Sequence, residues 1–224
     1  MVRLNDIEVT EKELFKNIVL DELSVSAPAT CKFAQELIEE IPGYFWVEAA
    51  SSTGKHHPEY SLGEGGLARH SLMTYHWLKT LMADCDQDLS EFAPGMVVAA
   101  LFHDCCKRGL PESVNLEHTV FEHPILAAKF LMDRSIKFIE DNKGFLETVI
   151  EDEGAFKRNV AVAVSCIETH MGKWTTSKYS EVVLPKPKTS IQYMVHLADY
   201  ISSRKCTTFD ARYFSDMFGH MANG

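Results

Sequence analysis

The sequence predicts an all-α domain, and three observations lead to this prediction. Apolar residues recur every three or four positions over 67–82 and again over 191–202, the spacing that keeps one face of a helix apolar. Proline stands near the start of apolar segments, at Pro28, Pro94 and Pro124, where its fixed φ suits the first helical turn. The alternating pattern of a half-buried strand is scarce. A helical bundle is therefore the expected fold.

The expected helices follow one another along the chain. Pro28 opens the first, and Pro42-Gly43 closes it, because neither residue readily continues a helix. The segment 96–102 is apolar on every side, so we expect it to be buried. The remaining expected helices are 67–82, 124–132, 160–169 and 191–202. The long loops 49–66 and 172–189 lie between them, and loops of that length in a compact domain are usually functional.

Length and composition set the domain organisation. The chain has 224 residues, of which 46% are hydrophobic, enough for one domain with a substantial core. We expect an N-terminal helical segment over 1–48, a core that carries the functional site over 49–206, and a C-terminal tail over 207–224.

Apolar runs, cysteines and net charge indicate where the protein is expected to be found and which partners it is expected to bind. The longest apolar run, 95–102, is shorter than the roughly 18 residues that cross a bilayer, and the first residues are charged, so we expect a cytoplasmic protein with no membrane partner. The 6 cysteines form no Cys-x-x-Cys pair and are interpreted as reduced thiols. A net charge of −10 disfavours long duplex nucleic acid. It leaves a small nucleotide or short oligonucleotide, held through metal ions, as the expected partner.

Histidine and aspartate recur at the apolar helices. The pair His103-Asp104 follows the most apolar segment, and Asp199 lies within another apolar helix. Buried charges of this kind need a partner. A single histidine in such a place, as at His70 or His170, is more often an ordinary core residue, and Asp104 alone could simply cap a helix. Because such residues occur on several separate helices, a shared metal ion is the better interpretation, and both residue types are ligands for zinc, iron and manganese.

This order of residues resembles a known family. His…His-Asp…His…His…Asp, with an apolar helix before His-Asp, is similar to the HD superfamily of metal-dependent phosphohydrolases over roughly His56 to Lys205. Asp104-x-x-Lys107 and the Leu-Ala-Asp that ends at Asp199 strengthen the resemblance. It implies an HD-domain helical bundle around a metal site, which hydrolyses a phosphate ester with metal-activated water.

A narrower resemblance is to the HD domain of YhaM-like 3′-5′ exoribonucleases. It rests on segments 49–57, 65–70 and 169–172, which contain Ala-Ala…Lys-His-His, Gly-Gly-Leu…His and Thr-His-Met-Gly, and on the later Leu184-Pro185. The sequence departs from that pattern in 115–124, where a glycine-rich segment is expected, and leaves no room for an N-terminal OB-fold. These departures weigh against a long polymer as the substrate.

The superfamily resemblance also implies a ligand set. Two divalent transition-metal ions, chosen among Fe, Mn, Zn, Co and Ni, would be held by His70, His103, Asp104, Asp199, His123 and His170. The first four would bind one ion and the two last-named histidines the other, with Asp104 bridging because a carboxylate has two oxygens. His118 competes with His123, which we prefer because Pro124 makes it the entry to a helix. If only one ion binds, His123 and His170 would contact the substrate phosphate instead.

Other polar residues are candidates for substrate contacts. Lys107, one helical turn from His103, is expected to stabilise charge on the transferring phosphoryl group. Phosphate-binding donors are expected at Lys55, His56, His57 and Lys173. Lys173 belongs to a lysine-rich loop after His170 that would attract anions. Trp174 and Tyr179 in that loop could stack a base or could simply anchor it.

Several functions fit these residues. The expected one is hydrolysis of a phosphate ester of a nucleotide or short oligonucleotide, by a phosphodiesterase or, alternatively, by a phosphomonoesterase or triphosphohydrolase. An oxygenase with a mixed-valence di-iron centre would use the same ligands. A nucleotide sensor without turnover is disfavoured because the ligand set is intact.

Overall fold

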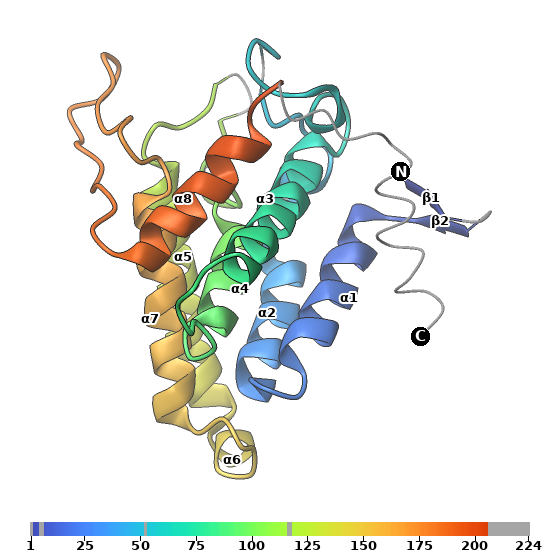
Figure 1. The fold of residues 1–224 in the computed structure, drawn as a ribbon, viewed down its shortest axis with the longest axis vertical. Coiled ribbons are helices and arrows are strands. Elements are labelled where there is room, and N and C mark those ends of the chain that lie inside the picture. The colour runs from blue at the N-terminus through green and yellow to red at the C-terminus, as the bar shows by residue number, and fades with distance from the viewer. Residues whose placement is uncertain (1, 5–6, 52, 116–117, 206–224) are drawn as a thin grey trace.

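The computed structural model describes residues 2–4, 7–51, 53–115 and 118–205. Helices form the body of this part of the chain (Figure 1), and the predicted all-α class is confirmed. The only strands in it are β1 (Val2–Leu4) and β2 (Ile7–Val9), which pair antiparallel with Leu4 opposite Ile7. The predicted tail over 207–224, and residue 206 before it, lie outside the described residues.

The chain first forms a helical pair. Helix α1 (Glu11–Leu23) begins at a capping box in which Thr10 and Glu13 satisfy each other's backbone N–H groups, and α2 (Pro28–Glu40) begins at its proline. The later elements are the short 3-10 helices η1 (Gly43–Trp46) and η2 (Glu59–Ser61), then α3 (Gly66–Ala83), α4 (Ala93–Phe102), α5 (His123–Asp141), α6 (Lys143–Leu146), α7 (Glu153–Thr169) and α8 (Ser190–Ser202).

Helices α5 and α7 are longer than the apolar segments predicted for them. Helix α5 continues past residue 132 to Asp141, and α7 begins at Glu153 rather than near residue 160. The added turns are mostly polar on their outer faces but still bury Phe138 and Phe156. The side chain of Asp152 accepts a hydrogen bond from the backbone N–H of Ala155 and so fixes where α7 starts.

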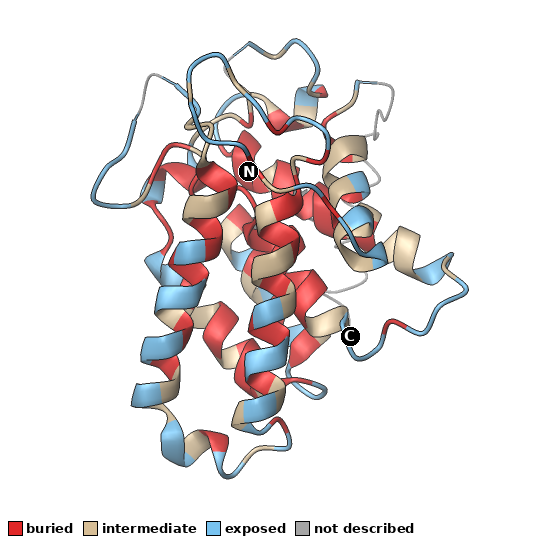
Figure 2. Ribbon diagram, turned by 90° about the vertical axis from the view of Figure 1, so that its left-hand side faces the viewer, coloured by how far each residue is buried: buried red, intermediate tan, exposed pale blue. Residues whose placement is uncertain are grey.

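Helix α4 lies at the centre of the bundle. It is buried from Gly95 to Phe102 and packs against α3, α7 and α8, with α1 and α2 on its other side. Gly95 makes the contact with α7 possible, because a Cβ there would lie 2.5 Å from the carbonyl oxygen of Asn159. Figure 2 shows the buried residues on the inward faces of the helices and the exposed ones outside. The most apolar segment is thus buried, as predicted.

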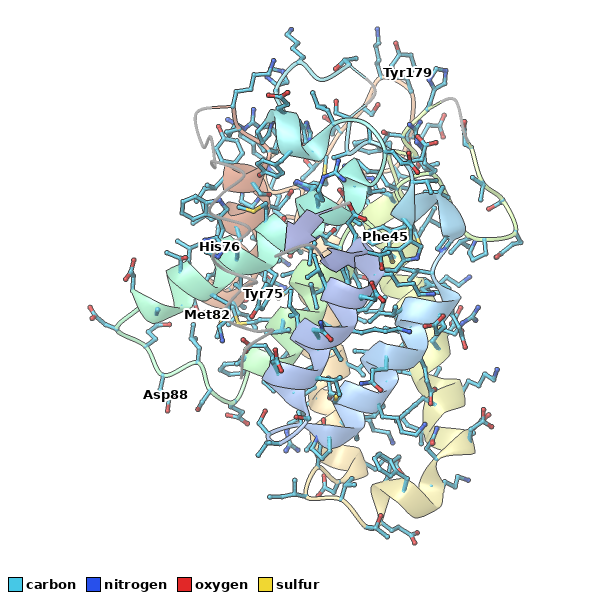
Figure 3. All side chains as sticks on the ribbon, turned by 90° about the vertical axis from the view of Figure 1, so that its right-hand side faces the viewer. Phe45, Tyr75, His76, Met82, Asp88 and Tyr179 are labelled. Atoms are coloured by element: carbon cyan, nitrogen blue, oxygen red, sulfur yellow. The ribbon has the colours of Figure 1, made fainter. Side chains whose placement is uncertain are left out.

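Aromatic side chains fill the core between the helices. Phe15 of α1 makes edge contacts with Phe45, Trp46 and Phe102, which ties η1 to α4. Phe45 is fully buried, and Figure 3 shows it within the bundle. A second cluster joins α2, α5 and α7 through Phe33, Phe138 and Phe156. Edge-to-face packing of this kind adds stability beyond the apolar area that it buries.

The loop over 49–66 is held against the start of α3. Arg69 donates hydrogen bonds to the carbonyl oxygens of Tyr60 and Leu62 at 2.6 and 3.0 Å and pairs with Glu11 at 2.7 Å. Gly66 lets the loop approach α3, since a Cβ there would lie 2.3 Å from the carbonyl oxygen of Ser61. In the described part of the chain, no helix is both long and apolar enough to span a membrane.

Candidate metal centre

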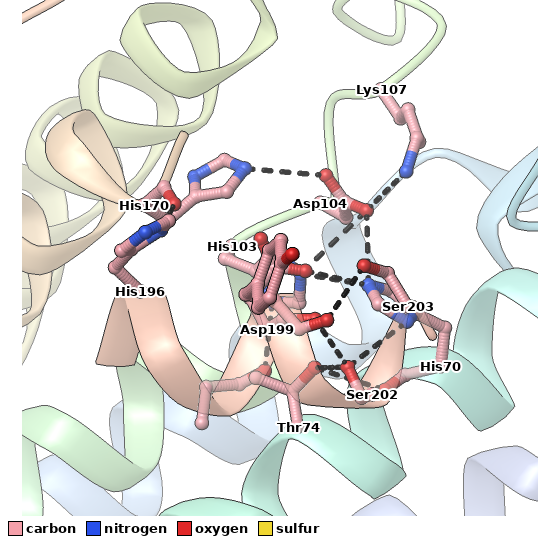
Figure 4. Close-up of polar contacts among 12 residues, drawn as sticks. His70, Thr74, His103, Asp104, Lys107, His170, His196, Asp199, Ser202 and Ser203 are labelled. Carbon is pink, nitrogen blue, oxygen red and sulfur yellow. Dashed lines mark hydrogen bonds and ion pairs between the residues drawn. The ribbon is translucent and has the colours of Figure 1, made fainter. Parts of the chain in front are cut away.

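Five segments bring the predicted ligands to one buried point. His70 lies on α3, His103 and Asp104 directly follow α4, and His123 is the first residue of α5. His170 caps the end of α7, and Asp199 lies on α8. All are buried except Asp199, whose side chain is 18% exposed. Figure 4 shows Asp104 between His170 on one side and the His70 and Asp199 pair on the other.

One group of donor atoms gathers around His70 and His103. Their Nε2 atoms are 3.4 Å apart. Asp199 Oδ1 lies 3.0 Å from the Nε2 of His70 and 3.6 Å from that of His103. Asp104 Oδ2 lies 3.7 and 3.6 Å from the same two nitrogens. Ligands about 2.1 Å from a shared ion are roughly 3 to 3.5 Å from one another. The donor atoms of His70, His103 and Asp104 lie close enough together to hold an ion, and so do those of His103, His170 and Asp199.

A second group gathers around His123 and His170. Their Nε2 atoms are 3.3 Å apart. Asp104 Oδ1, the oxygen that does not face the first group, lies 3.1 Å from the Nε2 of His123 and 3.7 Å from that of His170. The Asp104 carboxylate therefore presents one oxygen to each group, and the buried His and Asp side chains could hold a metal ion.

In three of these rings, the Nδ1 atom points away from the cluster toward a backbone carbonyl, and this contact fixes which nitrogen carries the proton. The Nδ1 atoms of His103, His123 and His170 lie 2.9, 2.8 and 2.8 Å from the carbonyl oxygens of residues 100, 120 and 167. A carbonyl can only accept a hydrogen bond, so Nδ1 carries the proton. In the neutral ring, Nε2 then presents a lone pair to the cluster. This is the orientation that outer-shell hydrogen bonds give to metal-binding histidines.

His70 is oriented by side chains instead. Its Nδ1 lies 3.3 Å from the Ser202 hydroxyl, which is 2.9 Å from the Thr74 hydroxyl. Both hydroxyls are fully buried. Sequence analysis did not single out either residue, although each lies one helical turn after a ligand, Thr74 after His70 and Ser202 after Asp199.

The pKa shifts indicate that both carboxylates of the centre are ionised. Burial acts against ionisation of Asp104, but Lys107 and His103 outweigh it and hold its pKa well below the usual value. Burial lowers the pKa of His170 to about 3, which keeps that ring neutral. At His103 burial is outweighed by Asp104 and Asp199, so its pKa is raised. The two carboxylates thus attract positive charge to the place where the Nε2 atoms meet.

The residues fit a bound cation for a further reason. Asp104 Oδ1 is buried and accepts no hydrogen bond, while the Nε2 atoms around it have no proton to donate when Nδ1 holds it. A buried carboxylate oxygen facing nitrogen lone pairs is unfavourable without a positive charge between them. A divalent cation would supply that charge.

A cavity of about 220 Å³ opens on the cluster. Its wall includes His57, Lys107, Trp174, Tyr200 and Arg204 beside the cluster residues. Lys107 Nζ lies 2.5 Å from Asp104 Oδ2. The His57 ring lies 5.4 Å from that of His70, and burial lowers its pKa to about 3.

Other residues singled out in the sequence lie apart from this wall. Lys55 and His56 are exposed and do not line the cavity, and Lys173 lies outside it with Nζ 5.1 Å from the Trp174 ring. His118 is on an exposed loop, where its backbone N–H donates to Asn115. The structure thus brings His123, rather than His118, to the cluster.

His196 is a supporting residue that the sequence analysis did not identify. Its Nδ1 donates to the carbonyl oxygen of His170 at 2.6 Å. Gly172 lies against the same ring and has a φ of 61°, and a Cβ there would lie 2.1 Å from the imidazole. A glycine two residues after His170 therefore lets α8 support the end of α7.

Comparison with protein-family models, curated proteins and solved structures finds no match to this chain. The chemistry that the centre can perform therefore follows from its own donor atoms. Four imidazoles and two carboxylates, each buried or largely so, form a set suited to borderline transition metals.

Proposed function

We propose that this protein is a metal-dependent phosphohydrolase of the HD superfamily that cleaves a phosphate ester of a nucleotide or short oligonucleotide. The observation that carries the proposal is the orientation of the imidazoles. Three rings are fixed through Nδ1 to backbone carbonyls, and the Nε2 atoms of all four meet at the two oxygens of Asp104. The order of these residues along the chain, which resembles that superfamily, supports the same proposal.

We assign the two groups of donors to two ions. His70, His103 and Asp199 would hold one, His123 and His170 the other, and Asp104 would contribute an oxygen to each. Fe, Mn, Zn, Co and Ni all accept such a mixture of imidazole and carboxylate ligands. When bound, divalent ions lower the pKa of water to near neutrality and neutralise phosphate oxygens.

The chain's own residues have separate tasks in this hydrolysis. Lys107 places an ammonium group beside Asp104 at the cavity wall, where it would neutralise charge that develops on the phosphoryl oxygens. Neutral His57 is largely screened from solvent beside His70, and its ring N–H would donate a hydrogen bond to an oxygen of the substrate phosphate. The bound imidazoles stay aligned because their Nδ1 atoms are held.

The test combines metal content with hydrolysis. Protein purified without added metal should contain transition metal and should hydrolyse bis-p-nitrophenyl phosphate. Lys107→Ala should keep its metal and lose roughly a hundredfold in turnover, the usual scale for removing one transition-state donor. Lys129→Ala, which removes an exposed lysine on α5, is the matched control and should behave like the wild type.

Two results would contradict the proposal. One is a metal-loaded protein that hydrolyses neither this ester nor any phosphomonoester, diester or triphosphate of a nucleotide. The other is a loss of metal in Lys107→Ala, which would make that lysine part of the metal-binding structure rather than a donor to the substrate.

A further inference from the structure

Three side chains form a stack in the wall of the cavity. The rings of Trp174 and Tyr200 lie at 18° to each other with centroids 5.5 Å apart. The guanidinium carbon of Arg204 lies 4.1 Å from the Tyr200 centroid and 5.7 Å from that of Trp174. All three line the cavity that also contains the metal-site candidates His170 and Asp199.

The stack is tied to the metal centre through the chain itself. Tyr200 directly follows Asp199, and Arg204 lies one turn further along. Trp174 comes four residues after His170, in a turn closed by its own N–H to the carbonyl oxygen of Met171 at 3.1 Å. The backbone N–H of Leu184 returns to Thr175 at 2.9 Å, and Thr175 is buried. The backbone that carries the indole is therefore held in a turn directly after His170, and the other two side chains follow Asp199 in the chain.

We infer that Trp174, Tyr200 and Arg204 form the subsite that binds the base of a nucleoside phosphate, an inference that rests on the proposed function for the phosphate end. Aromatic rings and stacked guanidinium groups bind the flat faces of bases. Trp174 is 39% exposed although it lies in a cavity wall and against Tyr200, so part of its ring is open to a ligand. A nucleoside phosphate is the class of ligand that combines a metal-binding anion with a planar ring.

Of the two aromatic residues in this loop that could stack a base, only Trp174 lines the cavity. Tyr179 is 84% exposed, has the Lys178 ammonium 4.7 Å from its ring, and does not line this cavity. Figure 3 shows it at the outer edge of the molecule. Trp174, and not Tyr179, therefore lies beside the candidate metal ligands.

The experiment compares two ligands that differ only in the base. Non-hydrolysable phosphonate analogues of adenosine monophosphate and ribose 5-phosphate, with CH₂ in place of the ester oxygen, are titrated calorimetrically into the purified protein. The adenosine analogue should bind at least about tenfold more tightly, the scale of one base on an aromatic side chain. In Trp174→Ala the ratio of the two affinities should fall to about one, and Trp174→Phe should restore most of it.

Further variants show whether a change in the affinity ratio is specific to the ring of Trp174. Tyr193→Ala removes a 52% exposed aromatic residue of α8 that is outside the cavity wall, and it should leave the ratio unchanged. If Trp174→Ala does not fold, Trp174→Leu keeps an apolar side chain without a ring face and gives the same comparison. A wild-type ratio near one, or an unchanged ratio in a folded Trp174 variant, would overturn the subsite. Absence of metal and of ester hydrolysis would instead refute the proposed function, so the two failures are distinguishable.

Discussion

Replacing Asp104 with asparagine should do more harm to metal binding than any other single change at the centre. Asparagine keeps the shape of the side chain but removes its negative charge. Asp104 is the only residue in the described chain whose two oxygens face both groups of donors, at 3.1 Å from His123 Nε2 and 3.6 Å from His103 Nε2. The imidazoles are neutral donors, so Asp199 alone would then offset the charge of the ions.

The expected size of the effect follows from the loss of one unit of negative charge beside each ion. Two unit charges 4 Å apart interact by about 4 kcal/mol at an effective dielectric constant near 20. Since 1.4 kcal/mol corresponds to a factor of ten, affinity for each ion should fall by about a thousandfold or more. Two cations that share no anion also repel each other. Asp104→Asn should therefore retain almost no metal and show no measurable ester hydrolysis.

The assay is elemental analysis after dialysis, alongside circular dichroism to show that the variant is folded. The wild type should hold close to two ions per chain, as proposed for the two groups of donors. Asp199→Asn should lose mainly one ion, because Asp199 Oδ1 lies 3.0 and 3.6 Å from the Nε2 atoms of His70 and His103. Asp88→Asn, an exposed site, should lose none. If Asp104→Asn keeps both ions and substantial activity, Asp104 is not a bridge and the two-ion assignment is wrong.

Two other predictions test single parts of the fold and the site. His170→Ala should lose one ion and stay folded, because its Nε2 lies 3.3 Å from that of His123 and 3.7 Å from Asp104 Oδ1. His118→Ala should change nothing, since His118 lies on an exposed loop. An unchanged metal count by elemental analysis in His170→Ala would remove His170 from the ligands. Glu151→Ala should lower the free energy of unfolding, measured in urea, by about 3 kcal/mol or more. The reason is that the buried carboxylate accepts hydrogen bonds from the backbone and hydroxyl of Thr30 and from Asn159. A loss no larger than that of the exposed control Glu147→Ala would show that this network contributes little.

Much of the fold could be predicted because helix formation is mainly a local property. The starts of α2 and α4 follow from Pro28 and Pro94, and the apolar spacing in α3 and α8 gives their extent. The predicted helices were too short where a helix continues through polar turns, as in α5 and α7, because burial of about one residue per turn leaves a weak apolar pattern. Helix α1 had a local signal that was not used, the Thr10-x-x-Glu13 capping box.

The sequence by itself determined the fold class, the position of most helices and the identity of the candidate ligands, since residue type fixes donor chemistry and spacing fixes the face of a helix. Only the tertiary structure decided how those faces meet. It places His123 rather than His118 at the cluster, turns each Nε2 inward, and brings Trp174 beside Tyr200 and Arg204. These contacts join residues far apart in the chain, and their geometry depends on how α7, α8 and the intervening loop pack together. No local pattern contains that information.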